Sequence, residues 1–213
     1  SYVVQRERLG TGNALWQARA FVKEPFFVVW PNKVTSKEIG AKVLAEREKG
    51  SEAVLVGAET STPWDYGVAR IEGERVREIV ENPEPGKEPS HIKVIGFYSL
   101  EPDFFSYYEK LSNHHEADFI DAINLYLKDK KASLVELQED VPALKYPWEL
   151  FGILNILLHL QGGKQIIAPS AKIGEGTVLE GPVYIGEECE IGAHNVLRGP
   201  LNLERGVKTA AFC

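Results

Sequence analysis

The segment from Gln5 to Asn13 holds residue types suited to nucleotide recognition. Gln5 carries an amide that can both donate and accept hydrogen bonds at the edge of a nucleobase. Five positions later comes the run Gly10-Thr11-Gly12, where a strand-like stretch gives way to a helix-like one. Glycines at a helix start let a ligand approach backbone N–H groups closely, which suits a base edge or a phosphate. Taken alone, the pattern is also compatible with an ordinary loop before a helix.

The elements that would position this segment alternate between strand and helix patterns. Strands are expected at residues 2–5, 26–30, 53–56, 67–71, 76–80, 92–100 and 133–137, and helices at 35–49, 102–111, 117–128 and 147–160. The strands at 67–71 and 76–80 flank a glycine-containing turn and predict a hairpin. Because strands alternate with helices, these residues predict an α/β layer fold with a mainly parallel sheet.

A six-residue repeat follows, in which an aliphatic residue recurs and a second, mostly small or apolar register comes four positions later. The registers are Ile167, Ile173, Leu179, Ile185, Ile191, Leu197 and Leu203, and Ala171, Thr177, Val183, Cys189, Asn195, Leu201 and Val207, reaching Cys213. Neither a helix nor a flat strand has this period, so it predicts a solenoid with both registers facing the interior. The change of pattern places a boundary near 161–164, giving an α/β domain over 1–162 and a repeat domain over 163–213.

The composition of the chain argues against nucleic-acid and membrane partners. The chain has 31 acidic and 24 basic residues and a net charge of −7, the wrong sign for binding a phosphate backbone, so no nucleic-acid partner is expected. The longest apolar run, Phe151 to Leu160, is too short to span a bilayer, and no leader opens the chain. The sequence predicts a cytoplasmic protein without a membrane partner. Cys189 and Cys213 give no support for a disulfide framework.

The order of short motifs resembles that of the sugar-1-phosphate uridylyl- and thymidylyltransferases. The matching motifs are Tyr66-Gly67-Val68, Glu81-Asn82-Pro83, Gly96-Phe97-Tyr98, Asp121-Ala122-Ile123 and Tyr146-Pro147-Trp148, followed by the hexads. In that family a glutamine and a Gly-Thr turn contact the pyrimidine, which implies nucleotide-binding roles for Gln5, Gly10 and Thr11. The resemblance also implies that Gly67 offers its backbone N–H to the sugar and that Glu81 accepts hydrogen bonds from sugar hydroxyls.

The resemblance implies a fold and a reaction. The fold would be a Rossmann-like nucleotidyltransferase domain, with its opening strand and phosphate loop ahead of Ser1, followed by a left-handed parallel β-helix that joins copies into a homo-oligomer. A sugar-1-phosphate oxygen would attack the α-phosphorus of UTP or dTTP and release pyrophosphate. Alignment of the substrates, together with Mg²⁺ on the phosphate oxygens, supplies most of the catalysis in such transfers.

The carboxylates expected to hold Mg²⁺ are replaced at the aligned positions. Asn32, or Lys33 if the loop is one residue longer, takes the first position, and Ala143 takes the second. Val94 replaces a family asparagine. Because Mg²⁺ prefers carboxylate and water ligands, these residues put the metal site in question. They favour a second hypothesis, a regulatory subunit that keeps the base and sugar pocket without the metal site.

Two histidine features have weaker functional interpretations. His194 lies at a turn of a hexad, where an acyltransferase could use it, but a solvated surface role is favoured. An acetyl-CoA site between coils is a further alternative to a structural role for the repeat. His114, His115 and Glu116 resemble a metal cluster, yet adjacent histidines lack the helical spacing of zinc ligands. A polar loop is the favoured interpretation.

Overall fold

The computed structural model describes residues 2–33, 37–138, 141–144, 146–159 and 164–213. It divides into two compact units, Ser1–Val141 and Pro142–Cys213. The division falls ahead of the helix at Glu149–His159, whereas the sequence analysis placed the domain boundary after it. The predicted linker at 161–164 lies almost wholly outside the described residues, and the predicted domain limits stay a prediction.

The first unit carries a six-stranded sheet with helices on both faces. Its elements are α1 (Gly10–Trp16), β1 (Phe26–Val29), α2 (Lys37–Glu48), β2 (Ala53–Glu59), η1 (Pro63–Asp65), β3 (Gly67–Glu72), β4 (Arg75–Glu81), β5 (Ile92–Leu100), α3 (Phe104–Glu109), α4 (Asp118–Asp129) and β6 (Ala132–Leu137). The strand order is β4-β3-β5-β2-β6, and β1 pairs with β5. The hairpin predicted around residues 72–75 is confirmed, since Glu72 pairs with Arg75 across its turn.

The prediction of a mainly parallel sheet is wrong. Strand β5 runs antiparallel to β1, β2 and β3, and β4 is antiparallel to β3. In the described sheet only β2 and β6 form a parallel pair. The strands β1, β2, β3 and β6 nevertheless run in one direction, so the sheet is mixed because a reversed strand lies at its centre. The order of strands and helices along the chain does not show that β5 lies antiparallel between β3 and β2.

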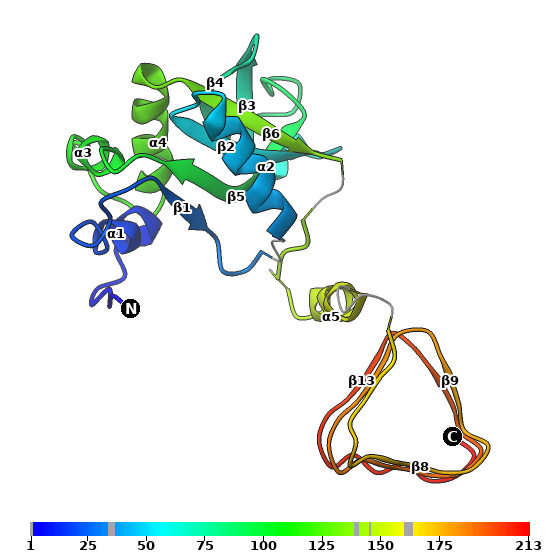
Figure 1. Cartoon of the computed structure of the whole chain (residues 1–213). Helices are drawn as coiled ribbons and strands as arrows, with labels where there is room; N and C mark the ends of the chain where they lie inside the picture. The colour runs from blue at the N-terminus through cyan, green and yellow to red at the C-terminus, as the bar shows by residue number, and fades with distance from the viewer. Residues whose placement is uncertain (1, 34–36, 139–140, 145, 160–163) are drawn as a thin grey trace. The chain divides into compact units, whose positions relative to one another are not determined.

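Burial on both faces explains why β2 is apolar throughout. Leu55 packs with Ile123 of α4 on one face, and Val54 packs with Val43 of α2 on the other. Figure 1 shows α2 and the α3–α4 pair on opposite sides of the sheet. A strand covered on both faces has no polar face, which is the pattern of Ala53 to Ala58.

Residues 2–5 do not form the predicted strand. Tyr2 and Val4 are largely exposed, and the described part of the chain provides no strand beside them. Strand propensity cannot form a ladder without a neighbour to accept its hydrogen bonds. The segment instead turns so that the Gln5 side chain meets the start of α1.

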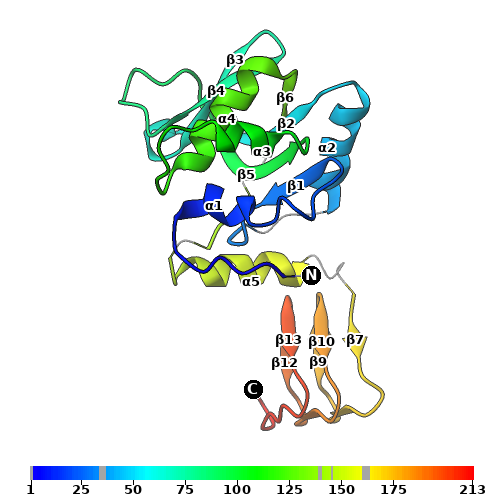
Figure 2. The same cartoon turned by 90° about the vertical axis from the view of Figure 1, so that its left-hand side faces the viewer.

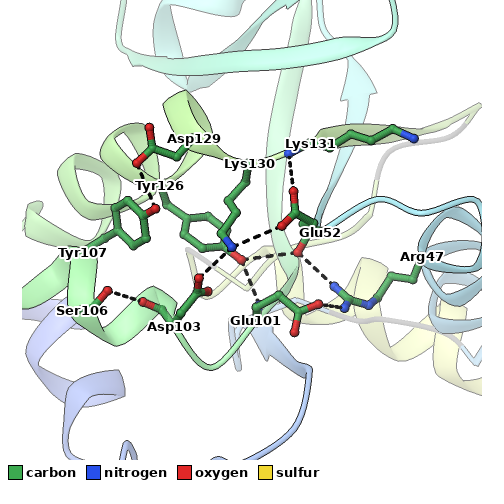
Figure 3. A network of polar contacts seen from close by, with 10 residues as sticks. All are labelled: Arg47, Glu52, Glu101, Asp103, Ser106, Tyr107, Tyr126, Asp129, Lys130 and Lys131. Carbon is green, nitrogen blue, oxygen red and sulfur yellow. Dashed lines mark hydrogen bonds and ion pairs between the residues drawn. The ribbon is translucent and has the colours of Figure 1, made fainter.

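A polar network joins the start of β2 to the end of α4 (Figure 3). Lys130 Nζ lies 2.7 Å from Asp103 Oδ2 and 3.2 Å from Glu52 Oε1. The hydrogen bond to Asp103 raises the pKa of Lys130, so this lysine stays charged at neutral pH. Glu52 also accepts a hydrogen bond from the Lys131 backbone N–H, at 3.0 Å. The network fixes the end of the sheet at which the parallel strands β2 and β6 begin.

The second unit contains α5 (Glu149–His159) and seven short strands. These are β7 (Ile166–Ile167), β8 (Lys172–Ile173), β9 (Val178–Glu180), β10 (Val183–Ile185), β11 (Glu190–Ile191), β12 (Val196–Arg198) and β13 (Leu201–Leu203). They form three parallel sheets, β13-β10-β7, β11-β8 and β12-β9. Figure 1 shows these sheets as the sides of a triangle, and Figure 2 shows β7, β10 and β13 side by side. No described helix of the chain is long and apolar enough to cross a membrane.

Both predicted registers contribute to the interior of these sheets. Val183, Ile185, Cys189 and Ile191 form its buried core, and Ala171, Leu179, Leu197, Leu201, Leu203 and Val207 pack against them. The inward prediction is wrong for Ile167 and Ile173, which are 41% and 37% exposed in the first strands of the unit and have no preceding strand among the described residues to cover them. Asn195 is also fully buried, and its Nδ2 donates to Ala210 O at 2.8 Å and to Thr209 Oγ1 at 3.0 Å. These bonds satisfy the amide in an otherwise apolar interior. The arrangement is compatible with the predicted β-helix.

We expect Ile185→Asp to destabilise the second unit. Ile185 is fully buried, and a carboxylate there would lack a partner, at a cost of about 3 kcal/mol or more. Val196→Asp is the matched control, because Val196 is 49% exposed on a neighbouring sheet. Thermal unfolding should show a large loss of Tm for the first variant and a small one for the second. Equal melting of the two variants would contradict the inward placement of Ile185.

Candidate functional site

The Gly10-Thr11-Gly12 run forms the first turn of α1 and lies against the segment before α4. Gly10 has a φ of +90°, and a Cβ there would come within 2.9 Å of the Glu116 backbone. A Cβ on Gly12 would overlap Asp118 Oδ1 and lie 2.6 Å from a Tyr108 ring carbon. Both glycines therefore permit close packing of α1 within the protein. Thr11, between them, is exposed.

The structure brings the three predicted nucleotide-binding residues together. Gln5 Nε2 donates to Gly10 O at 3.0 Å and to Asn13 Oδ1 at 3.0 Å. These bonds hold the Gln5 side chain over the turn that contains Thr11. Nucleotide contact by Gln5, Gly10 and Thr11 stays a prediction.

The two predicted sugar-binding residues are direct neighbours across the β3–β4 ladder. Gly67 pairs with Glu81, and a Cβ on Gly67 would overlap the Glu81 carboxylate. The absence of a side chain at Gly67 therefore lets Glu81 lie over that backbone. Tyr98 is buried beside them: burial strongly raises its pKa, and the Glu81 charge raises it further. Tyr98 thus remains a neutral phenol near the Glu81 carboxylate.

Trp30 is a residue of this region that the sequence analysis did not single out. Its backbone N–H donates to Gly96 O at 2.9 Å, and a Cβ on Gly96 would overlap the Trp30 ring. The indole also hydrogen-bonds Tyr98 and packs edge-on against Phe119, with ring centroids 5.4 Å apart. A signal was present in the sequence, because a glycine inside a strand often marks the close approach of another group.

The first residues of α4 pack beside the start of α1 and against Trp30 and Tyr98. Asp118 is fully buried, and its Oδ2 accepts hydrogen bonds from Tyr108 OH at 2.7 Å and from His114 Nδ1 at 3.1 Å. The next residue, Phe119, packs against Trp30 and against Tyr98. The start of α4 therefore contacts α1 at Gly12 through Asp118, and the rings of Trp30 and Tyr98 through Phe119.

A cavity of about 410 Å³ opens beside α1. Its lining includes Leu9, Asn13, Trp16, Tyr108 and His114, but not Gln5, Gly10 or Thr11. Apolar and aromatic walls with a few polar groups are typical of small-molecule pockets. The cavity therefore lies next to the predicted nucleotide turn without being formed by it.

The residues at the predicted metal positions do not fit Mg²⁺. Asn32 and Lys33 follow β1 in a turn closed by Lys33 N–H donating to Trp30 O at 3.1 Å, and Ala143 belongs to the second unit. An amide, an ammonium and a methyl group supply no carboxylate, which is the protein ligand that Mg²⁺ favours. Among the described residues, no three His, Cys, Asp or Glu side chains are grouped to hold a metal ion.

The histidines occupy structural positions. His115 Nε2 lies 2.7 Å from Asp121 Oδ2, while His114 faces Asp118, so the pair points to separate carboxylates. His194 has a φ of +55° and stacks on Phe212 with ring centroids 5.1 Å apart. His194 is exposed, in agreement with the surface role that the sequence analysis favoured over acyl transfer.

Residues 1–152 match the family model described as nucleotidyl transferase. The chain belongs to this nucleotidyl transferase family. It is 31% identical to a bifunctional sugar-1-phosphate nucleotidylyltransferase/acetyltransferase of Sulfurisphaera tokodaii, over 93% of this chain and 52% of that protein. It is also 31% identical to UTP--glucose-1-phosphate uridylyltransferase 1 of Staphylococcus saprophyticus, over 57% of this chain and 47% of that protein.

A UTP-bound UGPase from Acinetobacter baumannii has the same fold, with a TM-score of 0.64 and 20% identity over 73% of this chain and 59% of the other. The nucleotidyl transferase chain thus spans about half the length of the curated relatives it matches. The family resemblance inferred from the motif order is confirmed.

We expect Gly12→Ala to destabilise this nucleotidyl transferase domain. The added methyl group would press on Asp118 and Tyr108, and such overpacking costs roughly 1–3 kcal/mol. Gly40→Ala in α2 is the matched control, because no atom lies within 4 Å of its Cβ position. Alanine there should raise stability by about 0.5–1 kcal/mol through helix propensity. Denaturant unfolding measures both, and a stabilised Gly12→Ala would contradict the close packing of α1.

Proposed function

We propose that the chain is part of a sugar-1-phosphate nucleotidyltransferase that makes a nucleoside-diphosphate sugar from UTP or dTTP. The observation that carries the proposal is that the predicted nucleotide-binding residues meet at the start of α1 and the predicted sugar-binding residues are paired across β3 and β4, within a nucleotidyl transferase domain. A relative named as a sugar-1-phosphate nucleotidylyltransferase supports the reaction class. The enzyme is accordingly a transferase.

The nucleotide is placed at the turn of α1. Gln5 presents its side-chain amide, and Gly10 and Thr11 present backbone groups, to the edge of a pyrimidine. A pyrimidine such as uracil offers both a donor and acceptors along one edge, which an amide and backbone N–H groups can match. The exposed position of Thr11 leaves this side of the turn accessible to a ligand.

The sugar is placed at the Gly67–Glu81 pair. Glu81 is an acceptor for sugar hydroxyls, and Gly67 lets the carboxylate and the ligand approach the same stretch of backbone. Glu81 is exposed, so its carboxylate is accessible to a ligand.

In the reaction, an oxygen of the sugar-1-phosphate forms a bond to the α-phosphorus of the nucleotide. The bond between that phosphorus and the bridging oxygen breaks, and pyrophosphate leaves with the bonding electrons. The contribution of this chain is alignment, because holding base and sugar on one folded domain brings the reacting groups together. Mg²⁺ would neutralise phosphate oxygens in such a transfer, but the residues at its predicted positions supply no carboxylate.

We also propose that the second unit is a left-handed parallel β-helix that joins copies of the protein into a homo-oligomer. The three parallel sheets and the inward registers support the helix. Ion pairs between successive turns, such as Arg198 with Glu180 at 2.8 Å, leave the outer surface hydrophilic. The resemblance to hexapeptide-repeat proteins supports the oligomer.

We expect Gln5→Ala to weaken UTP binding by roughly 1–3 kcal/mol, because part of the base edge loses its partner. Gln17→Ala is the matched control: the Gln17 amide also donates to Asn13 Oδ1, at 3.2 Å, but is not assigned to the base. Calorimetric titration of the full-length protein with UTP, dTTP and ATP measures the effect. Tighter binding of ATP than of UTP would contradict the pyrimidine assignment.

A second prediction concerns the metal. We expect nucleotide-free full-length protein to bind Mg²⁺ very weakly, and the Asn32→Asp variant to bind it more tightly, since a carboxylate is restored. Asn82→Asp serves as a control carboxylate elsewhere in the first unit. Calorimetry with Mg²⁺ alone, followed by assays of nucleotide-sugar synthesis, tests this. Tight Mg²⁺ binding by the wild type would show that other residues hold the ion.

A further inference from the structure

The cavity beside α1 is separate from the residues assigned to the base and the sugar. It has a volume of about 410 Å³ and lies where α1 meets α3 and the segment before α4, which are neighbours in Figure 1. Its described lining contains none of Gln5, Gly10, Thr11, Gly67 and Glu81. A cavity of this size accommodates a small organic molecule. The chemistry of its walls indicates which kind.

The aromatic side chains of the cavity wall are fixed by contacts within the protein. Trp16 Nε1 donates to Glu109 Oε1 at 3.1 Å, and the Arg19 guanidinium lies 3.3 Å from the centre of the Trp16 ring. Tyr108 OH donates to the buried Asp118 Oδ2 at 2.7 Å. A ligand would therefore meet two aromatic side chains whose orientations are already set, which lowers the entropy cost of binding.

His114 gives the cavity a polar group of defined character. Its Nδ1 lies 3.1 Å from Asp118 Oδ2, and its ring centroid is 4.7 Å from that of Tyr108. Contact with a carboxylate oxygen favours the tautomer with the hydrogen on Nδ1, so a neutral imidazole has its lone pair on Nε2. The His114 side chain is 47% exposed, and no described residue hydrogen-bonds its Nε2. A ligand at this nitrogen must supply an O–H or N–H donor.

The neighbouring histidine lacks this property. His115 also lines the cavity, but its Nε2 lies 2.7 Å from Asp121 Oδ2 and its Nδ1 accepts from the Ala117 N–H at 3.2 Å. Both of its nitrogens are therefore occupied within the protein. The two histidines form a matched pair in which only His114 has a nitrogen left for a ligand.

The charges around the cavity disfavour an anionic ligand. The described lining carries two carboxylates, Glu109 and Glu116, and one guanidinium, Arg8. A phosphate or carboxylate in the cavity would face a surplus of negative charge, and like charges at short range repel. A neutral or cationic molecule is therefore favoured.

We propose that this cavity is a binding site for a small aromatic molecule, neutral or cationic, that donates a hydrogen bond to His114 Nε2. Its ring would pack against Trp16 and Tyr108, and its hydroxyl or amine group would meet the imidazole. Such a ligand needs no phosphate, so the site differs in chemistry from both subsites of the proposed function. The proposal goes beyond that function and does not depend on it.

Three probes with the same ring separate these requirements. Tyramine combines a phenol donor with an ammonium group, 4-methoxyphenethylamine lacks the phenol donor, and 4-hydroxyphenylacetate has a carboxylate in place of the ammonium group. In ¹H–¹⁵N spectra of the full chain, we expect tyramine to shift the indole resonance of Trp16 with a Kd of about 1 mM. The indole resonance of Trp64, which does not line the cavity, should stay in place.

The affinities of the other two probes test the donor and the charge. The methoxy compound should bind about fivefold more weakly than tyramine, the usual scale for one lost hydrogen bond. The carboxylate compound should also bind more weakly than tyramine, because it meets the surplus of negative charge. Equal binding of all three probes, or an unchanged Trp16 resonance, overturns the proposal.

The histidine pair supplies matched variants. His114→Phe should bind tyramine and the methoxy compound equally, because Nε2 is removed while a ring remains, and His115→Phe should keep the difference between them. Thermal unfolding checks the fold of both variants. If His114→Phe is unstable, Trp16→Leu leaves the His114–Asp118 pair in place and should weaken tyramine binding, measured on the ligand's own resonances. Full discrimination between the two probes in folded His114→Phe, or full affinity in Trp16→Leu, overturns the proposal.

Titration in the presence of UTP separates this site from the proposed nucleotide site. The Kd for tyramine should stay within about twofold when UTP is added, because the cavity is not formed by the residues assigned to the base. Displacement of tyramine by UTP would show that the cavity belongs to the nucleotide site, which overturns the proposal of a separate ligand. Failure of UTP itself to bind contradicts the proposed function and leaves the expected binding of tyramine unchanged.

Discussion

The buried carboxylate of Asp118 is the constraint on which the arrangement of the candidate site depends. A buried polar group is costly unless it is hydrogen-bonded, so Tyr108 and His114 must stay within hydrogen-bonding distance of Asp118 Oδ2. The same carboxylate occupies the space that a side chain on Gly12 would need. Helix α3, the loop before α4 and the start of α1 are thereby fixed to one point.

Helix α4 connects the Asp118 contacts at its start to a polar network at its end. At its first residues Asp118 and Phe119 contact the turn of α1 and the rings of Trp30 and Tyr98, and at its end Lys130 joins Glu52 and Asp103. Its apolar face packs on the sheet through residues such as Ile123. Because both ends are tied and the middle is buried, the helix fixes the position of the start of α1 relative to the sheet.

The second unit is stabilised by the stacking of its short strands. Its short strands have too little apolar surface to be stable singly, and stacking successive turns creates a continuous interior. Asn195 is a polar residue within that interior, and its side chain hydrogen-bonds groups on adjacent turns. Its Oδ1, for example, accepts from the Cys213 N–H at 2.6 Å. A satisfied buried amide of this kind favours one register between turns over a slipped one.

The sequence by itself determined the strand at Ile92–Leu100, the β3–β4 hairpin and most of the inward registers of the second unit, because period and turn chemistry are local properties. Motif order identified the family. Only the tertiary structure decided the reversed direction of β5, the absence of a strand before Gln5, the closeness of Trp30 to Gly96 and the burial of Asp118. Each of these depends on a partner distant in the chain, which no local pattern specifies.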